Sequence, residues 1–599
     1  MKVVLDIEAN SLVNPSHIWV IVCKCLEDNV THIFRKVTEN EEEKERFLAY
    51  SRGVDCWIGH SFLGYDYPVL NNLLGLSIPD IWTKCRDTLI LSKLFNYSRK
   101  GGHSIEQYGK EFGLEKGKFS DWTKYSQEME DYCVRDVEIC QRIYLDMASK
   151  AMSESWRPAI ELEHQFQLVV NSLHNNGFAF DSPSAKHLLE VVVQQIKELD
   201  VEIKKEFKPK PKLVKEIHPR RTQHGTLNRN DFRWVHSGDL SEYSGDPFSR
   251  ISWVPFNPNS HKQLVAVLDA AGWKPVDRTA TQQSWKVNEN NLNTLPKTAP
   301  SPARTLARRI LLESRRRTLT EWLGLVQADG RIHGKYYGIG AWTHRMAHQE
   351  PNTANIPTLD KLYGKEMRSL WQAGTASGNG KRLLVGVDAE GIQLRIFAHY
   401  INDKEFTDAL VRGRKSDKTD PHSLNQRILG RICKSRQDAK RFIYAYLLGA
   451  GIQKLAEVLG ARAPETQEAL DRLLGRYTGL AFLKQNTIPK DARNGYFIGL
   501  DNRRVPIPGE TPGDRKHLAM SGYLQNGEAI VIKKAACMLK DIFFCDIVHD
   551  EFVIECEEKD ARRIGREACE AIRIAGEQLK LRCPLAGEYH VGPTWASIH

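Results

Sequence analysis

The chain has 599 residues, more than one hydrophobic core usually serves, so several domains are expected. Its 41% hydrophobic and 27% charged residues exclude a largely disordered chain, and without about 18 consecutive apolar residues or a signal-peptide pattern we expect a cytoplasmic protein away from membranes. The net charge of +10 favours a polyanionic partner such as nucleic acid, although many basic proteins bind none.

The first 150 residues alternate short apolar runs with helical periodicity. Strand-like runs occur at 3–7, Ile18–Cys25 and Cys56–Gly59, and a helix is expected at 129–147. This alternation predicts an α/β domain. The twelve cysteines, with Cys23 and Cys25 among them, show no metal-binding spacing, so we expect reduced thiols.

The next part of the chain is mainly helical. A helix is expected at 159–175, closed by Asn176 and Gly177, with a domain boundary near 150–160. Residues 204–255 lose periodicity and are rich in lysine, arginine and proline, which indicates an inserted basic loop. Helical periodicity returns at 261–272 and 303–325. The second of these helices holds an arginine cluster that could grip a phosphate backbone or form an ordinary solvated face: Arg308, Arg309, Arg315, Arg316 and Arg317.

A first set of candidate catalytic residues lies near the N-terminus. Asp6 and Glu8 alternate along one strand and so point to the same face. Asp66 follows another apolar segment, and Tyr132 and Asp136 are one helical turn apart. Carboxylate oxygens suit Mg²⁺ or Mn²⁺, and two such ions can activate water against a phosphodiester. We expect the four acids to be metal ligands and Tyr132 to orient the water.

A second set lies in the C-terminal half. An apolar strand ends at Asp388, and two apolar runs meet through His549, Asp550 and Glu551 as in a β-hairpin. Asp388 and Asp550 are expected to hold two metal ions between a primer 3′-hydroxyl and a nucleotide phosphate, with Ala389 in the metal-binding set and Glu551 as an outer partner.

Between these acids, one helical face carries two cations and an aromatic ring. Arg436, Lys440 and Tyr444 recur every four residues, a stripe suited to a nucleoside triphosphate. An ordinary amphipathic helix is the alternative interpretation.

Together these segments resemble family A (polymerase-I-like) DNA polymerases. Asp388-Ala-Glu-Gly-Ile-Gln-Leu-Arg395, residues 436–451 and Val548-His-Asp-Glu551 resemble motifs A, B and C in their order along the chain. The first set of acids resembles the tyrosine-containing branch of the DEDD exonuclease superfamily. Trp342-Thr-His-Arg345 with Pro351-Asn-Thr-Ala-Asn-Ile-Pro357 resembles a further segment of family A. Within the family, the exonuclease at the N-terminus, Phe256-Asn-Pro-Asn-Ser260 and the ending Gly592-Pro-Thr-Trp595 to His599 resemble the bacteriophage replicative branch.

The resemblance implies an α/β multidomain fold in which an RNase-H-like exonuclease domain precedes a right-hand polymerase of palm, thumb and fingers. The boundaries expected are exonuclease 1–155, connector and start of the palm 156–180, thumb 181–335 with the basic insertion, palm 336–405, fingers 406–516, and palm with the C-terminus 517–599.

The resemblance also implies partners and contacts. We expect Mg²⁺, with two ions at each site and Mn²⁺ as a substitute, primer–template DNA, dNTPs, and phage helicase–primase and single-strand-binding proteins. A monomer that does not use thioredoxin is expected, because the insertion is too short and too basic for that docking role. The nucleotide contacts implied are Arg345, Gln393, His422, Arg436, Lys440 and Tyr444, and the DNA contacts implied are His517 and Gln525. The basic helical run adds Arg315, Arg316 and Arg317 as expected DNA contacts.

Two positions depart from the family pattern. Gln393 stands where a glutamate usually blocks the ribose 2′-hydroxyl, and Leu448 stands where a tyrosine near the template base is usual. Sugar selection and fidelity are therefore open questions. A stand-alone nuclease and a noncatalytic replication scaffold remain as rival interpretations, and primer extension with each dNTP omitted in turn distinguishes them from a polymerase.

Overall fold

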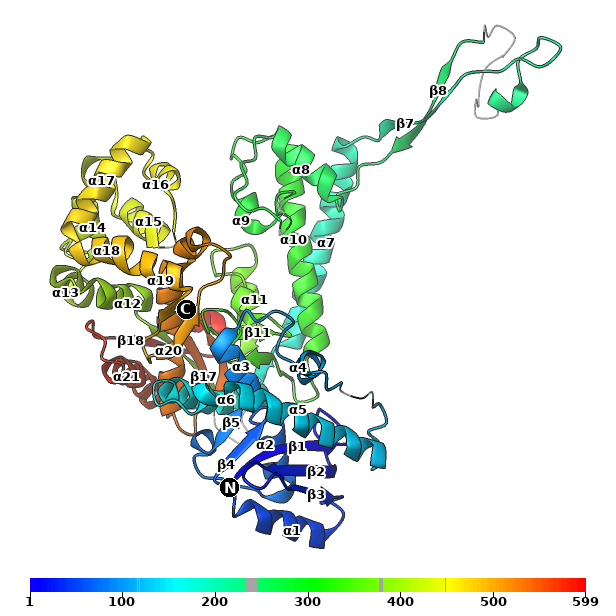
Figure 1. Cartoon of the computed structure of the whole chain (residues 1–599). Helices are drawn as coiled ribbons and strands as arrows, with labels where there is room; N and C mark the ends of the chain where they lie inside the picture. The colour runs from blue at the N-terminus through cyan, green and yellow to red at the C-terminus, as the bar shows by residue number, and fades with distance from the viewer. Residues whose placement is uncertain are drawn as a thin grey trace. The chain divides into compact units, whose positions relative to one another are not determined.

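The computed structural model describes residues 1–115, 117, 119–232, 245–279, 281, 283–375, 381–447 and 449–599. The chain divides into two compact units (Figure 1). The first comprises Met1–Phe180, Leu325–Leu359 and Met367–His599, and the second comprises Asp181–Gly324 and Asp360–Glu366. Within the described chain, no helix has both the length and the apolar character needed to cross a membrane.

The N-terminal part of the first unit is built on a mixed five-stranded sheet of order β3-β2-β1-β4-β5. β1 pairs antiparallel with β2 and parallel with β4, and both faces of its apolar sequence are largely buried. This confirms the predicted α/β character. The strands are β1 (Lys2–Ala9), β2 (Ile18–Cys25), β3 (Thr31–Arg35), β4 (Cys56–Gly59) and β5 (Cys85–Asp87).

Helices cover this sheet, and the longest of them carries two of the predicted site residues. α5 (Gln127–Ala151) begins where the Ser126 hydroxyl accepts from the N–H of Met129, and it packs on β1, β2 and β4. The other helices are α1 (Glu41–Ser51), α2 (Asp66–Leu74), α3 (Thr88–Asn96) and α4 (Ile105–Phe112).

The C-terminal part of the first unit is built on an antiparallel sheet of order β16-β17-β13-β18. Its strands are β13 (Arg382–Ala389), β16 (Phe544–Val548), β17 (Glu551–Glu557) and β18 (Gly587–Gly592). Three long helices share its core: α6 (Arg157–Asn176), α20 (Pro512–Met538) and α21 (Ala561–Gln578). A capping box between Thr511 and Asp514 fixes the start of α20.

Helices fill the segment between β13 and α20. They are α12 (Ile392–Ile401), α13 (Lys404–Arg412), α14 (Pro421–Leu429), α15 (Arg436–Leu447), α16 (Ile452–Leu459), α17 (Ala463–Arg476), α18 (Thr478–Phe482) and α19 (Ile488–Asn494), with the π-helix η6 (Leu483–Thr487) before α19. The short strands of this unit are β6 (Phe178–Phe180), β9 (Arg331–Ile332), β10 (Lys335–Tyr337), β11 (Ala347–Gln349), β12 (Trp371–Gln372), β14 (Tyr496–Ile498) and β15 (Arg504–Pro506).

The second unit consists of helices and a β-ribbon. α7 (Ser182–Glu206) and α10 (Ser301–Leu325) lie side by side, and α8 (His261–Ala270) and α9 (Glu289–Leu292) pack near them (Figure 1). The predicted basic loop at 204–255 needs correction, because β7 (Lys210–Ile217) and β8 (Phe248–Val254) form a long antiparallel ribbon. The exposed ribbon buries little apolar surface, so its sequence lacks the pattern that usually marks strands.

Candidate active sites

The N-terminal site begins with two carboxylates on β1. Asp6 and Glu8 are two residues apart on the strand, and their oxygens and the Cys133 sulfur lie within 4.8 Å of one another. The Cys133 thiol donates to the Asp6 Oδ2 at 3.4 Å. Sequence reasoning missed Cys133, although it directly follows Tyr132 on the buried face of α5.

Asp66 and Asp136 are buried beside the same cluster. The N–H of Ile7 donates to the Asp66 Oδ1 at 3.1 Å. Burial and then the negative charge of Asp6 raise the pKa of Asp66 well above its usual value. Burial and the charges of Asp6, Glu8 and Asp136 raise the pKa of the Cys133 thiol. Asp6, Glu8 and Asp66 therefore converge, and Asp136 lies near their neighbour Cys133 on α5. Such a set of mutually repelling oxygen donors fits a divalent cation.

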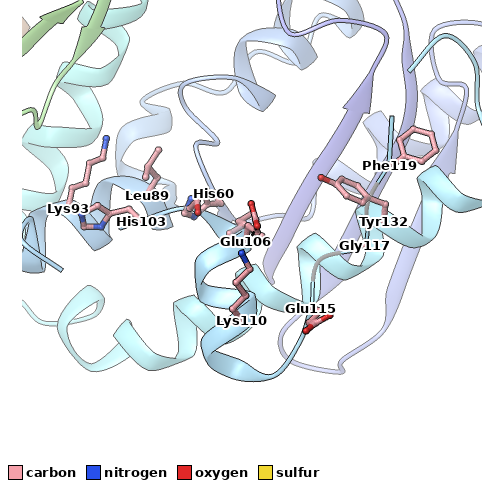
Figure 2. Close-up of a pocket in the computed structure, with 12 residues that line it drawn as sticks. His60, Leu89, Lys93, His103, Glu106, Lys110, Glu115, Gly117, Phe119 and Tyr132 are labelled. Carbon is pink, nitrogen blue, oxygen red and sulfur yellow. Dashed lines mark hydrogen bonds and ion pairs between the residues drawn. The ribbon is translucent and has the colours of Figure 1, made fainter. Parts of the chain in front are cut away.

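Tyr132 lines a cavity of about 1230 Å³ in this part of the chain. Figure 2 shows Tyr132 and Phe119 at one end and Lys93 and His103 at the other. The Tyr132 ring lies 5.8 Å from that of Trp122 and 6.2 Å from that of Phe119. His60, Glu106, Lys110 and Glu115 also line the cavity, which thus combines aromatic, cationic and acidic groups.

The C-terminal site lies where β13 meets the β16–β17 hairpin. Asp388 stands opposite Glu551 in the strand register, and the N–H of Ala389 donates to the Asp550 carbonyl at 3.0 Å. His549 and Asp550 form the hairpin turn, with His549 at φ 56°. The predicted hairpin is confirmed, and it brings Asp388 and Asp550 together.

Like charges also gather at this second site. Burial, Glu551 and Glu588 raise the pKa of Asp388 to about 6, and burial, Glu528 and Asp388 raise the pKa of Asp550 to about 7. The carboxylates fit a divalent cation for the same reason as the N-terminal set. Glu551 is tied to the chain end, since Trp595 Nε1 donates to it at 3.2 Å and His599 Nε2 lies at 3.3 Å.

Arg345 and Gln393 meet at a carboxylate that sequence reasoning missed. Arg345 Nη2 donates to the Glu528 Oε1 at 2.5 Å, and Gln393 Nε2 donates to the Glu528 Oε2 at 2.8 Å. Glu528 is only 1% exposed on α20. The available signal was an acid in an apolar helical run, three residues after Gln525 and so on the same helical face.

The predicted stripe on α15 is present. Arg436 pairs with Asp420 at 2.8 Å, Lys440 is exposed, and the half-buried ring of Tyr444 lies 6.2 Å from that of His422. Burial tends to raise the pKa of Asp420, but hydrogen bonds from Arg436 and Ser423 outweigh it and lower the pKa to about 2. Arg436 is thus held in place by a carboxylate that stays ionised at neutral pH.

The predicted DNA contacts are only partly accessible. His517 is exposed and Gln525 half-buried, both on α20. The expectation for Arg315 needs correction, because its side chain is 7% exposed and donates to Glu289 at 2.6 Å and to the Leu362 carbonyl at 3.0 Å. Arg316 and Arg317 pair with Glu313 and remain more exposed. Leu448 lies outside the described residues.

Two separate carboxylate clusters, one beside a cationic and aromatic stripe, define the class of metal-dependent enzymes of phosphoryl transfer. The sequence profile of DNA polymerase family A matches residues 238–597. The chain belongs to this family and is a DNA-directed DNA polymerase. Family A DNA polymerases use divalent metal ions, generally Mg²⁺.

Similar proteins support this placement along the whole chain. The DNA-directed DNA polymerase of Escherichia phage T7 is 25% identical over 721 residues, with 100% of both chains covered. That of Enterobacteria phage T3 is 25% identical, covering 90% of this chain and 92% of the relative. The fold resembles the POL domain of Pol1 from M. smegmatis, solved with DNA primer-template and dNTP, at a TM-score of 0.73 and 17% identity over 99% of this chain and 95% of that one.

Proposed function

We propose that this polymerase also removes nucleotides from DNA 3′ ends with its N-terminal site, and that it replicates a bacteriophage genome. The observation that carries the nuclease is the convergence of Asp6, Glu8 and Asp66. Cys133 belongs to this cluster, and Tyr132, the residue before it on α5, lines the cavity. Aromatic rings and lysines suit a single-stranded end, because bases stack on the rings while the cations meet phosphates. Family membership leaves the rival interpretations, a stand-alone nuclease or a noncatalytic scaffold, without support.

The nuclease site would hold two Mg²⁺ ions through Asp6, Glu8, Asp66 and Asp136, with Mn²⁺ as a substitute. Bound there, the ions would make water a better nucleophile and stabilise charge on the phosphate. The Tyr132 hydroxyl, at the edge of the cavity, would accept from or donate to the attacking water and so orient it.

The polymerase site would hold two Mg²⁺ ions through Asp388, Asp550 and Ala389, the last by its backbone carbonyl, and these ions would stabilise charge at the α-phosphate. Arg436 and Lys440 would bind the triphosphate, since both lie on one face of α15. Arg345, His422, Gln393 and Tyr444 would surround the nucleotide. His517 and Gln525 on α20 would contact the primer–template near its last pair.

Similarity to two phage polymerases over nearly the whole chain supports the replicative role. We therefore place the enzyme in the cytoplasm of an infected bacterium, acting as a single chain with a phage helicase–primase and single-strand-binding protein. The ribbon of β7 and β8 would contact DNA without borrowed thioredoxin, because residues 204–233 hold ten lysines and arginines against three acids.

The two activities are tested by separating them. Asp6→Ala with Glu8→Ala should slow degradation of a labelled 3′ end by about a thousandfold or more, because several kcal/mol of charge stabilisation are lost. The same protein should extend primers normally. Asp550→Ala should reverse the pattern. Loss of extension in the N-terminal double variant, with an unchanged circular dichroism spectrum, would contradict two independent sites.

A further inference from the structure

A single buried carboxylate joins two of the side chains assigned to the incoming nucleotide. Glu528 lies in the middle of α20, Arg345 precedes β11, and Gln393 lies in the first turn of α12. Each carboxylate oxygen serves one partner, Oε1 accepting from Arg345 and Oε2 from Gln393. Glu528 therefore connects three segments that are distant in the sequence.

The contact fixes the orientation of the Gln393 amide. An ionised carboxylate can only accept hydrogen bonds, so the amide must turn its NH₂ group toward Glu528 and its Oε1 the other way. Within the described part of the chain, no hydrogen bond joins Gln393 to Tyr444. Glu528 thus determines which end of the Gln393 amide, the Oε1 or the NH₂, points away from α20 toward the proposed nucleotide position.

The same geometry explains why residue 393 is neutral in this chain. A glutamate at 393 would face the buried carboxylate of Glu528 at hydrogen-bond distance, and two like charges there repel strongly. Gln393 and Glu528 are therefore a matched pair, in which the negative charge sits on α20 and the neutral acceptor on α12. Arg345 balances that charge.

We infer that Glu528 is a positioning residue of the polymerase site, which selects the sugar of the incoming nucleotide by orienting Gln393 and holding Arg345. This inference rests on the proposed roles of Gln393 and Arg345 at the nucleotide. Glu528 itself need not touch the substrate. Its removal should change sugar discrimination and nucleotide KM more than the maximal rate.

The first test is Glu528→Gln, which keeps the size of the side chain. A glutamine has one accepting end, so it can satisfy Arg345 or the Gln393 NH₂ but not both, and the Gln393 amide is free to turn over. The ratio of dNTP to rNTP kcat/KM should fall about tenfold, and dNTP KM should rise. Glu570→Gln, an exposed acid on α21, is the matched control and should match wild type.

The second test exchanges the pair. Gln393→Glu alone should lower dNTP kcat/KM, because it sets two carboxylates against each other. Gln393→Glu combined with Glu528→Gln should restore most of this loss, since the new amide on α20 would donate to the new carboxylate on α12 and still accept from Arg345. The exchanged pair still contains one carboxylate and one amide. It therefore tests the role of Glu528 even if the single variant Glu528→Gln folds poorly. Losses in the double variant equal to the product of the single ones would overturn the inference.

Gln393→Ala separates failure of this inference from failure of the site assignment. Relaxed ribose exclusion in Gln393→Ala, with wild-type exclusion in Glu528→Gln, would leave Gln393 at the nucleotide and overturn the role of Glu528. If Gln393→Ala excludes ribonucleotides as well as wild type does, Gln393 does not contact the sugar, and the inference about Glu528 is wrong as well. Relaxed exclusion in both single variants, with rescue in the exchanged pair, is the result expected.

Discussion

Lys533 on α20 donates to both oxygens of Glu163 on α6, at 2.8 and 2.6 Å, with both side chains almost fully buried. Arg503 also donates to Glu163, at 2.6 Å, and pairs with Asp501. The same guanidinium lies 3.1 Å from His344 Nδ1, and burial with the charges of Arg503 and Lys533 lowers the pKa of His344 well below its usual value. A buried ionic network therefore ties α6 to the residue next to Arg345.

Glu163→Ala should destabilise the first unit by about 3–5 kcal/mol, because it leaves two buried cations with only Asp501. Glu163→Gln should cost less, since its amide oxygen still accepts. Thermal unfolding followed by circular dichroism measures the loss. Glu558→Ala, which breaks only the exposed pair with Lys381, is the control and should change stability by about 0.5 kcal/mol or less. Equal midpoints for the Ala variants would contradict a stabilising network.

Stability and Mg²⁺ binding should be linked to pH through Asp388 and Asp550. Their pKa values of about 6 and 7 exceed the value of roughly 3.9 for an unfolded aspartate. The folded metal-free chain therefore holds protons that the unfolded chain has lost, and this contribution to stability disappears as pH rises through 6 to 7. Mg²⁺ should stabilise more at pH 8 than at pH 6, because protons compete for the same oxygens.

The measurement is the Mg²⁺-induced rise in melting temperature at the two pH values, in the Asp6→Ala and Glu8→Ala background so that the second site dominates. The apparent Kd for Mg²⁺ should increase by up to about tenfold for each unit by which the pH is lowered, for each proton that competes. Asp550→Asn should flatten the pH dependence. If Mg²⁺ raises the melting temperature as much at pH 6 as at pH 8, Asp388 and Asp550 do not bind the metal.

Tyr444 should govern the use of dideoxynucleotides. Its half-buried hydroxyl can occupy the space left by a missing 3′-hydroxyl and replace its hydrogen bond. The wild-type enzyme should incorporate dideoxynucleotides readily, and Tyr444→Phe should discriminate against them about tenfold more strongly. Tyr446→Phe, on the buried face of the same helix, removes a hydroxyl elsewhere and is the matched control. Equal ratios for Tyr444→Phe and wild type would refute this role.

The positions of the candidate metal-binding acids could be predicted because local sequence patterns determine them. Asp6 and Glu8 follow from strand alternation, and Asp388 and Asp550 from apolar strands that end in acids. Glu528 and Cys133 could not be found in this way. Each belongs to its site only because it contacts a residue more than 120 positions away in the chain. For Arg315 the local pattern was misleading. Its position in a basic run suggested an exposed DNA contact, but tertiary contacts bury its side chain.

The ribbon of β7 and β8 has two chemically different faces. Lys210, Lys212, Lys215 and Arg250 share one face in the strand register, once the bulge between Leu213 and Lys215 is counted, with Val254 at one end of this face and Ile217 and Phe248 at the other. Pro211, Leu213, Ile251 and Trp253 share the other, where Trp253 is 64% exposed. Four cations in a row suit a phosphate backbone, whereas the apolar face suits a protein surface.

Removal of the ribbon should shorten the products made per DNA-binding event. Lys210 and Val254 are paired across the ribbon, so a short Gly-Ser linker can replace residues 210–254 without strain. The salt dependence of DNA affinity should become flatter, because each lost phosphate contact reduces the slope by about one. Single-turnover nucleotide addition should change little, since Asp388 and Asp550 belong to the other unit.

Substitutions on each face then distinguish DNA from a protein partner. Replacement of Lys210, Lys212, Lys215 and Arg250 by glutamine should reproduce the deletion, because it removes the counterion-releasing charges and keeps the strands paired. Replacement of Leu213, Ile251 and Trp253 by serine is the matched control for the glutamine variant. It should leave the salt dependence of DNA affinity unchanged. Thioredoxin should not lengthen wild-type products under a DNA trap. A strong lengthening that the serine set abolishes would instead make the apolar face a docking site for that protein, since those side chains would be buried in the complex.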